Sequence, residues 1–185
     1  MRVQIFFRID TVRNGLIIPD GKWKRSNSLV QGFMALLCAQ LTGSSFTAID
    51  INGTNRTVSS YANNFLALGP AHDNTYGIQL GGDNTAVAIT DYALGSIFPD
   101  GAGSDELDYS ASTIVDPYTV AGSDAYCSFK RIMTNNSGAQ IDVEEIGLYA
   151  RLYISYKVCI DRTLQSFSIP NTEGKQITYK FLISV

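Results

Sequence analysis

Two adjacent acids, Glu144 and Glu145, stand in the middle of the apolar segment 141–150, and paired carboxylates can perform general acid and base chemistry. Such a pair acts when both groups face one cleft, about 5–10 Å apart. Neighbouring residues of a β-strand point to opposite faces of the sheet, so adjacent glutamates do not meet this requirement. The sequence therefore disfavours a catalytic role for this pair.

The apolar pattern around the two acids predicts a β-bulge. Counting every second residue from Ile141 places Val143 on the inner face but also turns Glu145 inward, whereas from Ile146 onward the even-numbered positions are apolar. One extra residue at Glu144-Glu145 restores the phase. We expect both acids to face solvent, with Val143 and Ile146 in the core.

The single histidine, His72, is the imidazole that a nucleophilic triad would have to use. No GxSxG motif accompanies it, and one imidazole beside scattered aspartates such as Asp73 falls short of zinc-ligand spacing. We interpret His72-Asp73 as a pair at a loop tip. The three cysteines lack CxxC spacing and are expected to be reduced and buried: Cys38, Cys127 and Cys159.

Two segments combine glycines with acids, residues 81–84 and 100–106. Neither has the alternating acidic ligands and closing Glu of an EF-hand calcium loop, and neither matches a phosphate-binding loop. The sequence thus predicts no catalytic residue, no metal ligand and no cofactor, and we expect a protein that is not an enzyme.

Composition points away from nucleic acids and membranes as partners. The 185 residues are 17% charged, with a net charge of −3 and an isoelectric point near 5.0, and the only basic cluster is residues 22–25. The apolar run 33–41 is too short to span a bilayer and contains Gln40. The N-terminus starts like a signal peptide, but Arg8 and Asp10 interrupt its apolar region, so we expect synthesis in the cytoplasm.

The elements that position these residues are mainly short strands separated by turns. Residues 3–9 alternate, and Asn14-Gly15 favours a tight hairpin before residues 16–18; Asn52-Gly53 suggests a second hairpin. No glycine or proline marks a turn between 150 and 156, so that strand either continues or folds back. Further strands are predicted in the segments 46–51, 56–61, 76–80, 85–89, 126–133, 140–150, 156–160 and 176–184, and a long exposed loop in 100–112.

One amphipathic helix is predicted at about residues 28–42, with an N-cap among Ser26 to Ser28 and a stop at Gly43. Gly32 inside it indicates close packing or a weaker helix. We therefore expect one domain, residues 1–185, forming an antiparallel β-sandwich of jelly-roll type with the N-terminal hairpin and the helix packed on the sheet. The predicted apolar face consists of Leu29, Phe33, Leu36, Leu37 and Leu41.

The segments "YGIQLGGDNTAVAITDYALGSIF", "FKRIMTNNSGAQIDVEEIGLY" and "VCIDRTLQSFSIPNTEGKQITYKFLI" resemble a module of virion structural proteins from tailed bacteriophages. The resemblance covers roughly residues 76–185 and, more loosely, residues 26–37. The positions that carry it are Gly81, Gly82, Asp91, Tyr92, Leu94, Asn135, Asn136, Gly138, Glu145, Ile146, Gly147, Leu148, Tyr149, Asp161, Arg162, Pro170, Gly174, Thr178, Tyr179 and Phe181.

This resemblance implies a β-sandwich subunit of the virion, with a decoration (cement), fibre or tail role and no activity. The expected partners are copies of the chain itself, by analogy in a cyclic trimer, and other virion proteins such as capsid or tail proteins. Residues 100–112 and 176–184 are the predicted contact elements. One alternative is a carbohydrate-binding module that recognises a receptor and uses Trp23 or Tyr109; another is a glycan-cleaving enzyme.

Overall fold

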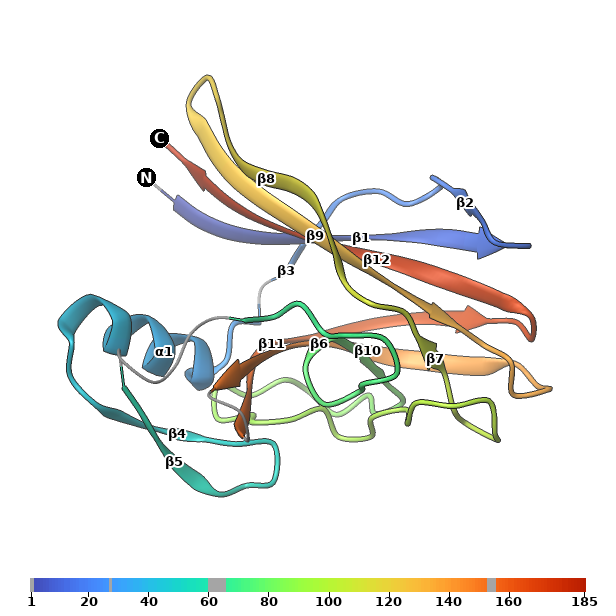
Figure 1. Ribbon diagram of the computed structural model, residues 1–185, viewed down its shortest axis with the longest axis horizontal. Helices are drawn as coiled ribbons and strands as arrows, with labels where there is room; N and C mark the ends of the chain where they lie inside the picture. The colour runs from blue at the N-terminus through green and yellow to red at the C-terminus, as the bar shows by residue number, and fades with distance from the viewer. Residues whose placement is uncertain (1, 27, 60–65, 153–155) are drawn as a thin grey trace.

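The computed structural model describes residues 2–26, 28–59, 66–152 and 156–185, and it is mainly β, as predicted (Figure 1). The one helix in these ranges, α1, spans Gln31–Thr42, and no described helix is long and apolar enough to cross a membrane. The strands are β1 (Arg2–Arg13), β2 (Leu16–Ile18), β3 (Lys24–Ser26), β4 (Phe46–Ile49), β5 (Asn55–Val58), β6 (Gly77–Gly81), β7 (Asp108–Tyr109), β8 (Thr113–Ala121), β9 (Asp124–Thr134), β10 (Ile141–Leu152), β11 (Tyr156–Ile169) and β12 (Glu173–Ser184).

The strands form two facing antiparallel layers and one small hairpin. The larger sheet has the order β2-β1-β12-β9-β7, with β3 also on β1 and β8 also on β9; the smaller sheet has the order β11-β10-β6, and β4 pairs with β5. The layers bury one apolar core between them, to which the larger sheet contributes Phe7 and Ile177 and the smaller sheet Leu148 and Ile160. This arrangement confirms the predicted sandwich-like fold (Figure 1).

Both predicted hairpin turns are present. Asn14 and Gly15 have φ angles of 51° and 73°, the left-handed pair that a two-residue turn needs, and Arg13 pairs with Leu16. Gly53 has φ 75° between β4 and β5. Because β10 and β11 pair antiparallel, the chain folds back after Leu152, although residues 153–155 lie outside the described ranges.

The bulge in β10 is confirmed, but the prediction for one of its acids is wrong. The register with β11 shifts between Val143 and Glu145, and Val143 and Ile146 are fully buried. Glu144 is half-buried, whereas Glu145 is fully buried beside Arg162 rather than in solvent. The alternation of apolar residues located the bulge. The orientation of Glu145 is set by Arg162, which is distant in the sequence.

The helix is shorter at its start than predicted. Gly43 closes it in a left-handed conformation, φ 69°, as expected, but its N-cap is Val30, without a side-chain hydrogen bond. Ser26 belongs to β3 instead and donates its hydroxyl hydrogen to Asp161. Gly32 marks close packing, because a Cβ there would lie 2.3 Å from the carbonyl oxygen of Cys159. Of the predicted apolar face, Leu36 is buried, Leu29, Phe33 and Leu37 are half-buried, and Leu41 is exposed.

Several other predictions are corrected by the structure. Residues 85–89 form no strand, and β8 was not foreseen. The segment 100–112 is not wholly an exposed loop, because it contains β7 and the fully buried side chains of Leu107 and Tyr109. Strand β12 offers no pairing edge, since β1 and β9 flank it on both sides.

Candidate functional site

A buried ion-pair network joins Glu145 to Asp83 and Asp91 through Arg162. Arg162 Nε lies 2.7 Å from Glu145 Oε2, and its Nη1 lies 2.8 Å from Asp91 Oδ2. Its Nη2 lies 3.3 Å from Asp83 Oδ2. Burial lowers the pKa of Arg162, but hydrogen bonds to Asp91 and Glu145 outweigh it, and the net pKa is raised. One guanidinium therefore ties β10 and β11 to the loop 82–99.

This network gives Glu145 an architectural role. Its Oε1 accepts a hydrogen bond from the Ser96 N–H at 3.1 Å, whereas Glu144 accepts one from the exposed hydroxyl of Ser166. The adjacent acids thus have separate partners. A Cβ at Gly81 would lie 2.5 Å from Glu145 Oε1, so the glycine leaves room for the carboxylate. Gly81, Asp91 and Glu145, which carry the resemblance, therefore pack around or pair with the buried Arg162.

The three cysteines differ in exposure, contrary to the prediction that all are buried. Cys159 is buried, Cys38 is half-buried and Cys127 is exposed. Burial raises the pKa of Cys159, so it stays a thiol, and its Sγ donates to the Asp161 carbonyl at 3.3 Å. Burial also raises the pKa of Cys127. Neither Cys127 nor Cys159 has the lowered pKa of an activated nucleophile.

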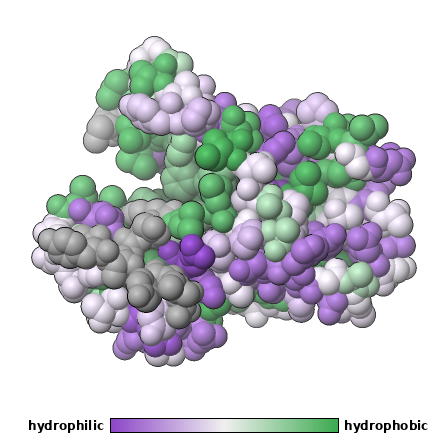
Figure 2. Space-filling view, in the orientation of Figure 1, coloured by the Kyte–Doolittle hydropathy of each residue, from purple (hydrophilic) through white to green (hydrophobic). Residues whose placement is uncertain are grey.

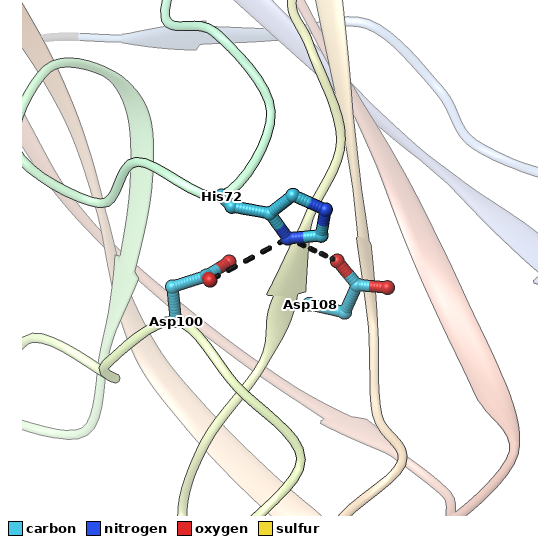
Figure 3. Close-up of side chains that lie close together, drawn as sticks. All are labelled: His72, Asp100 and Asp108. Carbon is cyan, nitrogen blue, oxygen red and sulfur yellow. Dashed lines mark ion pairs between the residues drawn. The ribbon is translucent and has the colours of Figure 1, made fainter.

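The structure brings His72 together with Asp100, in the loop before β7, and Asp108, on β7, and not with Asp73 (Figure 3). His72 Nδ1 lies 3.5 Å from Asp100 Oδ2 and 3.4 Å from Asp108 Oδ1. The imidazole is 70% exposed. Sequence spacing gave no signal for this cluster, because residues 72, 100 and 108 are far apart in the chain and meet through backbone hydrogen bonds of Tyr109 to His72 and Asp100.

The two aromatic candidates for glycan binding have different surroundings. Tyr109 is fully buried, donates its hydroxyl hydrogen to the Phe98 carbonyl at 3.0 Å, and has the Arg131 guanidinium over its ring. It cannot offer a face to a sugar. Trp23 is 41% exposed, but Arg8 and Lys180 both lie against its ring, 5.2 and 5.5 Å from the centroid.

An apolar cleft opens between α1 and the larger sheet, with a volume of about 320 Å³. Helix α1 contributes Phe33 and Leu37, and β9 contributes Cys127 and Phe129. The remaining lining residues are Ala67, Ile160 and Phe181. The cleft is therefore an open continuation of the core rather than a polar active site.

The inner face of the larger sheet continues beyond the cleft as an exposed apolar row, which we call the open row: Val3, Ile183, Ala125 and Val120. These residues are register partners across β1, β12, β9 and β8, and Val3 shares its face with the core residue Ile5. Val3, Ile183 and Val120 are 52%, 43% and 63% exposed. Figure 2 shows apolar surface around the end of the β8–β9 hairpin and a hollow beneath it.

Comparisons with protein-family models, with curated proteins and with solved structures find no match to this chain.

Proposed function

We propose that this protein is a non-enzymatic structural subunit of a tailed-phage particle, a capsid decoration (cement) protein or a head- or tail-associated protein, that assembles with copies of itself and contacts other virion proteins. The observation that carries the proposal is the open row, an exposed apolar part of the inner face of the larger sheet. Large exposed apolar patches typically mark interaction surfaces. The resemblance to virion modules supports a place in a phage particle, and the open row supports association of the protein with copies of itself.

Strand β8 favours a second copy as the occupant of this surface. It pairs with β9 on one side, and no other described strand pairs with it. Ile114, Val115, Tyr118 and Val120 on this strand are between 46% and 78% exposed. A free edge lined by apolar side chains pairs readily with another strand, and in a closed homo-oligomer each copy covers the edge of its neighbour. By analogy, a cyclic trimer is the expected symmetry.

The test is the mass of the protein in solution, by light scattering coupled to size-exclusion chromatography. Val120→Lys should dissociate the oligomer, whereas Ile89→Lys, at a loop position 66% exposed, is the matched control and should leave it intact. Cryo-electron microscopy of purified particles should then show density at repeated positions. A wild-type protein that stays monomeric and is absent from virions would refute the proposal.

Of the two aromatic residues named for the alternative of a carbohydrate-binding module of a phage fibre, Trp23 remains a candidate, because Tyr109 is buried. Binding on a glycan array that disappears in Trp23→Ala would favour this alternative.

A further inference from the structure

The His72 cluster has the spacing of metal ligands rather than of hydrogen-bonded groups. Its two N···O distances are 3.4 and 3.5 Å, longer than the roughly 2.7–3.2 Å of an N–H···O hydrogen bond. Around a tetrahedral zinc ion with metal–ligand bonds of about 2.0–2.2 Å, neighbouring ligand atoms lie about 3.4 Å apart. All three ligand atoms lie within 4.8 Å of one another.

The backbone of Tyr109 holds two of these ligands in place. Its N–H donates to Asp100 Oδ1 at 3.0 Å, which leaves Oδ2 directed toward the imidazole. Its carbonyl accepts a hydrogen bond from the backbone N–H of His72 at 2.9 Å. Asp108 is the preceding residue of β7 and pairs with Thr134. The fully buried Tyr109 thus fixes the base of the cluster, while the side chains of His72, Asp100 and Asp108 are 70%, 21% and 43% exposed.

We propose that His72, Asp100 and Asp108 bind one divalent transition-metal ion of the zinc type. Two carboxylates and a neutral imidazole supply two negative charges and one nitrogen, a set that suits zinc, whereas calcium prefers oxygen ligands alone. Three protein ligands leave the fourth tetrahedral position to water or to a neighbouring molecule. The ion would join the loop before β6 to Asp100 in the loop before β7 and to β7 itself. This inference does not depend on the proposed function.

Calorimetric titration of the metal-stripped protein with zinc chloride tests the site. The background should be Cys127→Ser, because an exposed thiol also binds zinc. We expect one ion per chain and a rise in melting temperature with zinc concentration, since a ligand of the folded state stabilises it. Calcium chloride should give neither effect. Cobalt(II) should bind with the strong visible absorption of a tetrahedral complex.

Substitutions distinguish the proposed site from a simple ion pair. His72→Asn, Asp100→Asn and Asp108→Asn should each weaken zinc binding by about tenfold or more. At position 72, asparagine tolerates the left-handed backbone conformation, φ 57°. At position 100, asparagine keeps a side-chain oxygen that can accept the hydrogen bond from the Tyr109 N–H. Asp105→Asn removes one charge from an exposed position of the same loop and should leave zinc binding unchanged. Absence of zinc binding, or equal weakening by Asp105→Asn, would overturn the proposal.

Discussion

Glu144 and Glu145 offer a matched pair of substitutions, because they are chemically identical neighbours with different surroundings. Glu145→Gln removes the charge that faces Arg162 Nε at 2.7 Å in a buried environment. Losing one partner of a buried ion pair costs about 3–5 kcal/mol. Here Arg162 keeps Asp91 at 2.8 Å and Asp83 at 3.3 Å, and the glutamine oxygen can still accept one hydrogen bond. We therefore expect a loss of about 1.5–3 kcal/mol, the range for one hydrogen bond to a charged group.

Glu144→Gln should change the free energy of unfolding by less than about 0.5 kcal/mol, because its hydrogen bond to Ser166 is exposed. Urea denaturation of both variants, with unchanged slope, measures the difference directly. For a chain of this length the Glu145→Gln melting temperature should fall by about 3–12 °C. Equal stability of the two variants would refute the buried network as a stabilising feature.

Three further predictions follow from individual contacts. Leu36→Ala should cost about 2–5 kcal/mol in urea denaturation because Leu36 is fully buried, whereas Leu41→Ala, at a position 75% exposed, should cost almost nothing. Gly32→Ala should lower the melting temperature despite the better helix propensity of alanine, because the new Cβ would lie 2.3 Å from the Cys159 carbonyl oxygen and push α1 away from β11. Burial raises the pKa of Asp50, but hydrogen bonds from Arg56 and from two backbone N–H groups of the β4–β5 turn outweigh it, and the net pKa is lowered. The stabilisation by ionised Asp50 is therefore present above the unfolded-state pKa of about 3.9 and is lost as pH falls through the lower folded-state pKa. The free energy of unfolding, measured across this pH range, should lack this pH-dependent contribution in Asp50→Asn.

Local chemistry was readable from the sequence wherever a few neighbouring residues decide the structure. Asn14-Gly15 and Asn52-Gly53 specify their turns because these residues tolerate positive φ angles. Gly43 ends α1 for the same reason. The broken alternation after Val143 located the bulge, because strand side chains have a fixed period of two. These features were sufficient to predict a mainly β, sandwich-like fold.

Only the tertiary structure decided which distant residues meet. Glu145 turns inward because Arg162 arrives on β11, and Ser26 leaves the helix N-cap because Asp161 accepts its hydroxyl hydrogen. His72 gains Asp100 and Asp108 in place of its sequence neighbour. Strand order likewise placed β12 in the centre of its sheet and β8 at the edge. A sequence pattern fixes the period of an element and the residues of a turn, but the partner of a buried charge and the neighbour of a strand depend on long-range pairing, which local periodicity does not encode.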